Sequence, residues 1–329
     1  MTMDLREMLE KNPERRYIMF GGKGGLGKTT FSAATAYYLA KKGFKVLVFS
    51  VDPQASLSDI FQKPIFGKGT VEIMPNLYAQ EIDADQRIRA YQDEIRQKIL
   101  TMYGMDKVPE EIENYIQAAA AEPAMEESAI FDAVVDIVVG GDYDYYIYDL
   151  VPLGHALYYL SMASVYDEWI DKITALRTEM SEYDQMAAVM QRKKETSEDQ
   201  ILEELQHIKS RINTSSGILT DRKKTAFFFV LTPEEMIILD TQKAAGLFAK
   251  FDVPLSGYIV NRVIPAELAG QDIPAYLRNR LSMQGHYLER IDATFGDQVL
   301  QRVPELERDV TGLDMIRLMA RSMFGEIPD

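Results

Sequence analysis

The chain of 329 residues contains no cysteine, three histidines and one tryptophan. Without cysteine it cannot form a disulfide, a thiolate zinc site, an iron–sulfur cluster or a thiol nucleophile. The histidines, at positions 155, 207 and 286, are scattered along the chain, which disfavours a dedicated soft-metal site. The sequence therefore excludes thiol chemistry and points away from transition-metal chemistry.

Long apolar runs are also absent. No stretch approaches the roughly 20 consecutive apolar residues of a transmembrane helix, and the opening residues MTMDLREMLEKNPERR lack the apolar core of a secretory signal. The 36 Lys and Arg residues are outnumbered by 51 Asp and Glu, which gives a formal charge of −15. This excess opposes phosphate backbones and anionic lipid surfaces. We therefore expect a cytoplasmic protein with no integral membrane segment and no nucleic-acid partner.

Short β-rich runs alternate with helical patterns along the chain, which is typical of βαβ units. The runs are nearly continuous in apolar residues, as expected for strands covered on both faces. We therefore predict an α/β fold with a mostly parallel central sheet flanked by helices. The predicted strands are residues 17–20, 45–50, 77–82, 145–149, 226–231, 256–261 and 298–303.

Two charged helical segments, residues 85–121 and 164–212, interrupt the alternation. In the second, apolar residues recur at steps of three and four from Val165 through Trp169 and Ile173 to Met190. A capping box at Ser197 and Gln200 then opens a further helix. These stripes are typical of helix-packing faces. We predict an inserted all-helical subdomain of residues 85–121 with 164–212, and an α/β core of residues 1–84 with 122–163 and 213–329.

The segment GGKGGLGKTT, residues 21–30, lies directly between a predicted strand and a predicted helix. It satisfies the pattern G-x-x-x-x-G-K-[ST], in which glycines turn backbone N–H groups toward phosphate at a helix N-terminus. Lys28 would reach the β- and γ-phosphates, and Thr29 would ligate Mg²⁺. The alternative is a glycine-rich turn that only packs tightly. The predicted nucleotide contacts are Gly22, Lys23, Gly24, Gly25, Gly27, Lys28, Thr29 and Thr30.

A second lysine, Lys23, lies inside this loop and would ordinarily be a solvated charge. The pattern K-G-G-x-G-K-T-T, however, resembles the deviant Walker A group of P-loop ATPases. That group includes septum-site and plasmid-partition ATPases, nitrogenase iron protein, and the arsenite-pump and tail-anchored-protein targeting ATPases. In the group, the lysine matching Lys23 crosses a dimer interface to the partner's nucleotide. The resemblance therefore implies a homodimer that sandwiches ATP.

The segment VDPQASLSDIF, residues 51–61, is similar to switch I of the arsenite-pump and targeting branch. The resemblance implies that Asp52 orients or deprotonates the attacking water, with Asp59 in the same segment. The alternative for Asp52 is an Asp-Pro turn after a strand.

The segment YYIYDLVPLGHAL, residues 145–157, resembles the branch's switch II, D-T-A-P-T-G-H. Asp149 would then meet Mg²⁺ directly or through water. Pro152, Gly154 and His155 also match, although His155 alone would be an ordinary structural residue. Leu150 and Leu153 replace family hydroxyls, and Val151 departs as well, which implies slow hydrolysis or altered coupling.

Later segments follow in the branch's order, so that the resemblance runs from about residue 17 to residue 312. LTPEEMIILDTQKA and GYIVNRVIP resemble two of its motifs, and Asn261 would hydrogen-bond the adenine edge. The alternative for Asn261 is a turn residue at a strand end. VPELERDVTG is similar to the loop that closes over the base, which adds Pro304 and Glu305 to the predicted nucleotide contacts.

Nitrogenase iron protein is excluded because its cluster needs cysteine, and arsenite bound through thiols is excluded likewise. We favour a homodimeric Mg²⁺-dependent ATPase that binds ATP and ADP, with Asp52, Lys28 and the partner's Lys23 as catalytic residues. Its nucleotide state would gate a helical subdomain that binds a hydrophobic helical client or a membrane protein partner. Two alternatives stay open: an ATPase energising an anion or arsenite efflux partner, and a nucleotide-responsive scaffold with weak hydrolysis.

Overall fold

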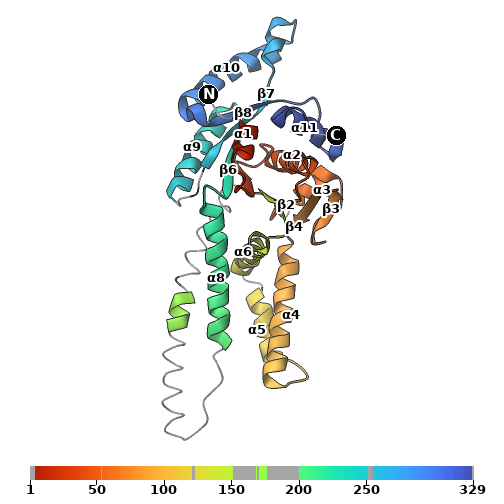
Figure 1. The fold of residues 1–329 in the computed structure, drawn as a ribbon, viewed down its shortest axis with the longest axis vertical. Helices are drawn as coiled ribbons and strands as arrows, with labels where there is room; N and C mark the ends of the chain where they lie inside the picture. Colours follow the sequence, from red (N-terminus) through yellow and green to blue (C-terminus); the bar gives the residue numbers. More distant parts are fainter. Residues whose placement is uncertain are drawn as a thin grey trace.

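The computed structural model describes residues 4–52, 54–120, 123–150, 168, 170–175, 200–250, 253 and 255–327. Within these residues eight strands form one sheet in the order β3-β4-β2-β5-β1-β6-β7-β8 (Figure 1). Every neighbouring pair is parallel except β3 with β4. The strands are β1 (Tyr17–Gly21), β2 (Val46–Ser50), β3 (Val71–Met74), β4 (Leu77–Glu81), β5 (Tyr145–Asp149), β6 (Thr225–Leu231), β7 (Leu255–Val263) and β8 (Val299–Pro304). The predicted α/β fold with a mostly parallel sheet is confirmed.

Helices cover both faces of the sheet, which explains why its central strands β2 and β6 are buried along their whole length. All seven residues of β6 are buried. On one face, Phe227 stacks on Phe248 of α9 (Glu235–Lys250), with ring centroids 4.7 Å apart. The next residue, Phe228, lies on the other face with its ring 5.6 Å from that of Phe20. Strand β6 therefore contributes alternate side chains to two hydrophobic layers.

Helices α2, α11 and α10 also pack on these two faces of the sheet. Tyr38 of α2 (Lys28–Lys41) stacks on Phe324 of α11 (Gly312–Phe324), with ring centroids 4.2 Å apart. On the α9 side, Tyr258 of β7 packs on Phe295 of α10 (Ala275–Phe295) at 4.1 Å. Short 3-10 turns at η1 (Ala266–Gly270) and η2 (Gly296–Gln298) flank α10. Helices α2 and α11 thus lie on one side of the sheet and α9 and α10 on the other (Figure 1).

Strand β3 and helix α1 are among the elements that were not predicted from the sequence. Strand β3 adds an antiparallel edge to the sheet through a tight turn at Asn76, whose φ is +68°. Helix α1 (Leu5–Glu10) begins at Asp4, whose side chain accepts the N–H of Glu7 at 2.7 Å. Its last residue, Glu10, accepts hydrogen bonds from Lys42 and Tyr38, which lower the pKa of Glu10 to about 2. These bonds attach α1 to the end of α2.

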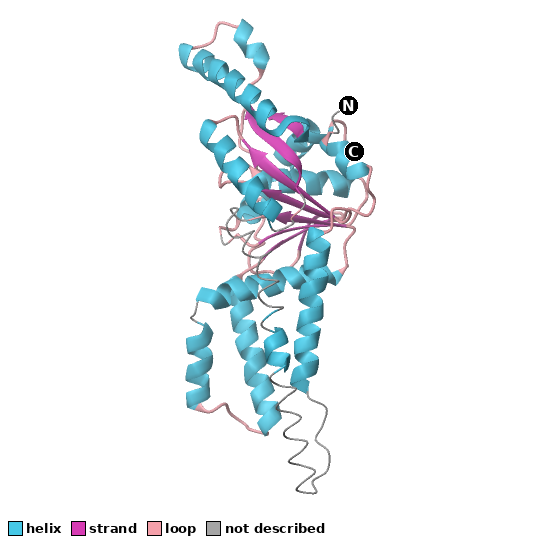
Figure 2. Ribbon diagram, turned by 90° about the vertical axis from the view of Figure 1, so that its left-hand side faces the viewer, coloured by secondary structure: helices cyan, strands magenta, loops and turns pink. Residues whose placement is uncertain are grey.

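A group of long helices extends from one end of the sheet (Figures 1 and 2). It comprises α4 (Ala84–Tyr103), α5 (Glu110–Ala120), α6 (Pro123–Gly140) and α8 (Gln200–Thr220), and residues 170–175 are also helical. Helix α6 packs against α4 and α8, and its residues Val134 and Val138 join the core under the sheet. The predicted division into core and subdomain stays a prediction. The stripe at 165–190, apart from Ile173, and the capping residue Ser197 lie outside the described residues.

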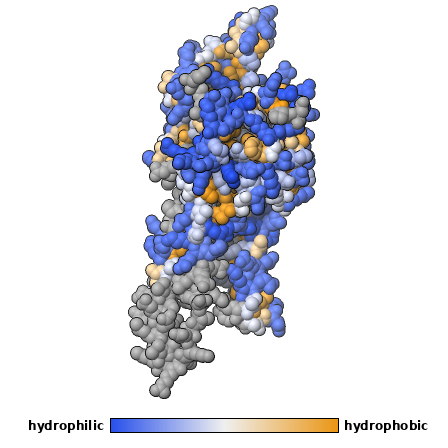
Figure 3. All heavy atoms as spheres, viewed as in Figure 1, coloured by the Kyte–Doolittle hydropathy of each residue, from blue (hydrophilic) through white to orange (hydrophobic). Residues whose placement is uncertain are grey.

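The surface is mostly hydrophilic, as the many charged residues of the sequence lead one to expect. On the face drawn in Figure 3, hydrophilic residues predominate and apolar residues form small separate groups. No helix in the described ranges combines the length and the hydropathy needed to cross a bilayer.

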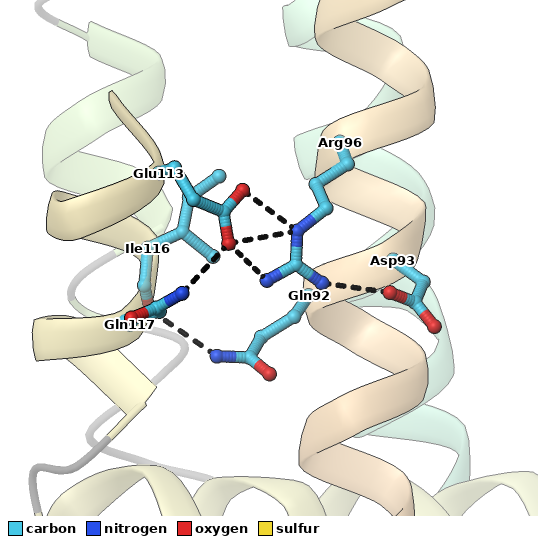
Figure 4. Close-up of polar contacts among 6 residues, drawn as sticks. All are labelled: Gln92, Asp93, Arg96, Glu113, Ile116 and Gln117. Carbon is cyan, nitrogen blue, oxygen red and sulfur yellow. Dashed lines mark hydrogen bonds and ion pairs between the residues drawn. The ribbon is translucent and has the colours of Figure 1, made fainter. Parts of the chain in front are cut away.

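Charged side chains join the long helices to one another. Arg96 of α4 donates two hydrogen bonds to the carboxylate of Glu113 of α5, from Nη2 to Oε1 at 2.6 Å and from Nε to Oε2 at 2.9 Å (Figure 4). Nearer the sheet, Arg87 of α4 pairs with Asp132 and Asp136 of α6. Arg211 of α8 pairs with Asp136 from the opposite side. Asp136 is therefore shared by two arginines and connects three helices.

Replacing Asp136 by asparagine should lower the free energy of unfolding by about 1 kcal/mol, because two guanidinium groups lose a charged partner at once. Urea denaturation followed by circular dichroism measures this. The matched control is Asp93→Asn, since among the residues that the structure describes Asp93 pairs with Arg96 alone and its side chain is 74% exposed. An equal effect of the two substitutions would show that sharing Asp136 adds nothing.

Candidate functional site

The loop between β1 and α2 crosses the carboxyl edge of the sheet. Gly22 has a φ of +148°, and a Cβ there would lie 2.5 Å from the carbonyl oxygen of Val230. Gly27 has a φ of +96°, and its Cβ would lie 2.6 Å from Nδ2 of Asn261. Only glycine fits at either position. Because Gly27 immediately precedes α2, the loop leads into the N-terminus of a 14-residue helix, where an anion is favoured.

Lys28, the first residue of α2, is only 8% exposed. Its Nζ donates to the carbonyl oxygen of Lys23 at 3.3 Å, so the side chain folds back under the loop. Burial lowers the pKa of Lys28, and the charges of Asp149 and Asp52 oppose that shift. The structure thus brings together the lysine and both carboxylates that the sequence analysis selected.

Asp149 ends β5, and its register places it beside Phe20 at the end of β1, where the loop begins. Thr29 Oγ1 donates to Asp149 Oδ2 at 2.7 Å, and Ser32 Oγ donates to Oδ1 at 3.1 Å. Burial raises the pKa of Asp149 to about 6 despite these bonds. Ser32 was not selected from the sequence, although its position three residues after Thr29 places both hydroxyls on one face of α2.

The residues present fit a hard, oxygen-ligated cation. The Asp149 carboxylate is buried, and its hydrogen bonds and the charge of Lys28 do not offset the rise in its pKa that burial causes. The hydroxyl of Thr29 lies in contact with it. Mg²⁺ prefers such oxygen ligands and is usually held by one or two protein groups together with phosphate and water. In the described ranges, no group of three or more His, Cys, Asp or Glu could hold a metal on its own. Thr29 and Asp149 are therefore the residues suited to a nucleotide-bound Mg²⁺.

Asp52 lies two residues beyond β2 and is half-buried. Its backbone N–H donates to Ser50 Oγ at 3.1 Å, and its Oδ1 accepts the N–H of Gln54 at 2.9 Å. Ser50 Oγ in turn donates to the carbonyl oxygen of Asp149 at 3.4 Å. The carboxylate of Asp52 is near enough to influence the pKa of both Lys28 and Asp149. Asp59, by contrast, is exposed on α3 (Ser56–Phe61).

Lys23 lies on the outer side of the same loop, beside the exposed Gly24 and Gly25. Its side chain is 54% exposed, and its Nζ lies 3.0 Å from Oδ2 of Asp240 on α9. The two lysines of the loop therefore occupy opposite environments, Lys28 inside it and Lys23 at the surface.

Three further candidates lie on the late strands. Asn261 of β7 is 8% exposed, and its Nδ2 donates to the carbonyl oxygen of Leu26 in the loop at 2.8 Å. Pro304 ends β8 opposite Val263 of β7, and the N–H of Glu305 donates to the carbonyl oxygen of Val263 at 3.0 Å. Both Pro304 and Glu305 are exposed. Asn261 contacts the phosphate loop itself, whereas the other two lie one strand farther out.

The segment after Asp149 is described only at its first residue. Leu150 is buried, and its N–H donates to the carbonyl oxygen of Phe20 at 3.3 Å. Its side chain supplies no hydroxyl. Residues 151–155, which include Pro152, Gly154 and His155, lie outside the described residues.

Comparison with known proteins identifies the family. The model of the anion-transporting ATPases matches residues 15–325, nearly the whole chain. The chain belongs to this family. It is therefore an ATPase of the anion-transporting ATPase family.

Relatives within the family carry different names. A protein of Aquifex aeolicus provisionally named arsenical pump-driving ATPase 1 is 31% identical over 95% of this chain and 80% of its own length. The provisionally named arsenical pump-driving ATPase 2 of the same organism is 29% identical over 92% and 97%. ATPase GET3A of Arabidopsis thaliana is 28% identical over 98% and 89%. The family assignment therefore leaves the physiological role of this chain open.

Proposed function

We propose that the chain acts as a Mg²⁺-dependent homodimer in which ATP hydrolysis controls what the helical part binds. The observation that carries the proposal is the opposite placement of two lysines in one phosphate loop. Lys28 is 8% exposed and lies where it can neutralise phosphate in its own chain. Lys23 is 54% exposed and points out of the loop, where a second chain's nucleotide can reach it.

The proposed chemistry is in-line attack of water on the γ-phosphate, which breaks the bond from the γ-phosphorus to the β–γ bridging oxygen and releases ADP and phosphate. Asp52 accepts a hydrogen bond from the water, while Lys28 and the partner's Lys23 neutralise the charge that develops in the transition state. Thr29 and Asp149 would hold Mg²⁺, which neutralises phosphate charge when bound. Asn261, Pro304 and Glu305 would contact the base, since β7 and β8 end on the same edge of the sheet as the loop.

The ion pair between Lys23 and Asp240 does not prevent this role. Both side chains are solvent-accessible, 54% and 35% exposed, and such pairs contribute at most about 1 kcal/mol. A partner's phosphate charge outweighs a single exposed carboxylate, because several anionic oxygens lie together. Lys23 can therefore leave Asp240 when the nucleotide-bound chains meet.

Two inactive variants should complement each other if Lys23 acts across the dimer. Lys23→Ala and Lys28→Ala alone should each lower turnover by about 10²-fold or more. Co-expressed in equal amounts, they should recover about one quarter of wild-type turnover, because half of the randomly formed dimers are mixed and each mixed dimer has one complete site.

The control for Lys23→Ala is Lys11→Ala, another exposed lysine paired with a single carboxylate, which should leave turnover unchanged. Specific activity of the wild type should also rise with protein concentration as dimers form. If the co-expressed variants recover no activity although each binds as wild type to a tagged second copy, Lys23 does not act across the interface.

For the role of the helical part, we propose an apolar helical client or partner. Large apolar side chains are exposed on or beside its helices, namely Tyr91, Met105, Ile112, Tyr115 and Ile208. Flexible and aromatic residues of this kind suit promiscuous apolar contacts. The absence of cysteine removes the thiols that would coordinate arsenite. The resemblance to targeting ATPases agrees with such a client.

The second candidate is an ATPase that drives anion or arsenical efflux, which the names of the Aquifex aeolicus relatives favour. Turnover measured with arsenite, with antimonite and with a transmembrane-helix peptide separates the two. We expect the transmembrane-helix peptide to change turnover, and neither arsenite nor antimonite to do so. Stimulation by either metalloid would favour efflux, and no response to any of the three would favour the scaffold.

A further inference from the structure

Glu81, the last residue of β4, is a buried carboxylate that the proposed chemistry does not use. It is 1% exposed. Its Oε1 accepts the N–H groups of Leu57 at 2.6 Å and of Ser58 at 3.1 Å, and its Oε2 accepts the hydroxyl of Ser58. Within the ranges that the structure describes, no lysine or arginine pairs with Glu81. Its charge is therefore stabilised by donors from one short segment, the start of α3.

Ser58 extends this arrangement to the loop after α3. Its Oγ accepts the N–H groups of Ile65 at 3.0 Å and Phe66 at 3.2 Å while its own hydrogen points to Glu81. Both lone pairs and the hydroxyl hydrogen of Ser58 are thus committed. The Glu81 oxygen that faces Ser58 must therefore be an acceptor. In Glu81→Gln, an amide N–H would face the hydroxyl hydrogen of Ser58, so that two donors would oppose each other.

The strand register relates Glu81 to the site. Ser50 of β2 lies opposite Asp149 of β5 on one side and opposite Glu81 of β4 on the other. These three residues therefore form a row along the carboxyl edge of the sheet. Ser50 Oγ accepts the N–H of Asp52, and Glu81 accepts the N–H groups of Leu57 and Ser58, so that these two attachments lie on either side of Ala55.

Between these two attachments the backbone is strained. Ala55 has a φ of +52° and a ψ of 39°, a left-handed conformation that costs a residue with a Cβ roughly 1 kcal/mol or more. Such a conformation persists only where the surrounding contacts impose it. On the α3 side, the carbonyl oxygen of Ala55 accepts the N–H of Asp59 at 3.2 Å, and Glu81 holds the N–H groups of Leu57 and Ser58.

We infer that Glu81 is a positioning residue for ATP hydrolysis, because it fixes the start of α3 and thereby the place of Asp52. The inference rests on the proposed role of Asp52. Strands β2 and β5 separate β4 from β1, so Glu81 lies away from the phosphate loop. Its loss should therefore affect the chemical step rather than nucleotide binding.

The test is a double-mutant cycle with Glu81→Gln and Asp52→Asn. In the wild-type background, Glu81→Gln should lower kcat by about tenfold or more while the Kd for ATP stays within about twofold. In the Asp52→Asn background the same substitution should change kcat by less than about twofold, since the group that it positions is gone. Glu72→Gln on β3 is the matched control, an exposed carboxylate on the neighbouring strand that should leave kcat unchanged.

Each other outcome contradicts the inference. An unchanged kcat in Glu81→Gln shows that the carboxylate is not needed, and an equal loss in both backgrounds shows a general structural role. If Glu81→Gln does not fold, Ser58→Ala removes the hydroxyl that donates to Glu81 and accepts the N–H groups of Ile65 and Phe66. It keeps both backbone N–H bonds to Glu81 and should give a smaller loss of kcat that again vanishes with Asp52→Asn. Full turnover in Asp52→Asn overturns the role of Asp52 and this inference but leaves the ATPase intact. Absence of ATP binding by the wild type overturns the proposed function itself.

Discussion

Lys28→Ala should lower ATP turnover by about 10³-fold, the largest loss expected from any single substitution in the loop. Lys28 is buried beneath the loop, with its Nζ donating to the carbonyl oxygen of Lys23. An ammonium group in this low-dielectric position neutralises phosphate far more effectively than one in water. Steady-state release of phosphate measures the loss.

The control is Lys41→Ala at the other end of α2, which shortens a half-buried lysine of the same helix. It should keep turnover within about twofold of the wild type. Persistence of turnover in Lys28→Ala, in a preparation free of other ATPases, would remove the assignment of the phosphate loop.

Asp149→Asn should have two effects of opposite sign. Turnover should fall by about 10³-fold, because the carboxylate suited to Mg²⁺ is lost. The metal-free protein should nevertheless become more stable at pH 7, by up to roughly 3 kcal/mol, because a buried charge is removed. Asparagine keeps the shape of the side chain and can still accept the hydrogen bond from Thr29.

The stability effect has a definite pH dependence. The pKa of Asp149 is raised from 3.8 to about 6, so between these two values the folded protein binds a proton that the unfolded chain has released. The free energy of unfolding therefore falls as the pH rises through that window, and the full cost of the charge is present above it. Asp149→Asn removes this fall.

Urea denaturation in EDTA without nucleotide, at several values of pH between 4 and 8, tests the prediction. Asp142→Asn, an exposed aspartate just before β5, is the control and should follow the wild type at every pH. If the wild type and Asp149→Asn show the same pH dependence, the raised pKa is wrong.

Much of the fold could be predicted because its information is local. Seven strands follow from continuous apolar runs, and the phosphate loop follows from a spacing within ten residues. Strand β3 was missed because VEIM carries only four residues and one buried position, which gives little periodic signal. Helix α1 was missed because its six residues depend on contacts distant in sequence: Leu5 and Leu9 are buried in the core, and Glu10 bonds to Tyr38 of α2.

The candidate site, too, could be predicted only where its residues belong to a local motif. Thr29, Lys28 and Asp149 each belong to a recognisable motif; in the structure Thr29 bonds to Asp149, and Lys28 is near enough for the two charges to interact. Ser50 and Glu81 belong to no motif, and their relation to Asp149 depends on the register of three strands that are distant in sequence. Whether a lysine of the loop is buried or exposed is likewise decided by packing. The sequence predicted Lys28 at the phosphates and Lys23 in solvent or against a partner, but the ion pair of Lys23 with Asp240 could not be read from spacing.

Isothermal titration of ATP and of ADP, each with Mg²⁺, into the purified chain tests the central claim most directly. The account predicts uptake of one nucleotide per chain, weakened strongly by Lys28→Ala and little by Lys41→Ala. Absence of binding heat for both nucleotides up to millimolar concentration, in a preparation whose circular dichroism shows the folded α/β protein, would contradict it.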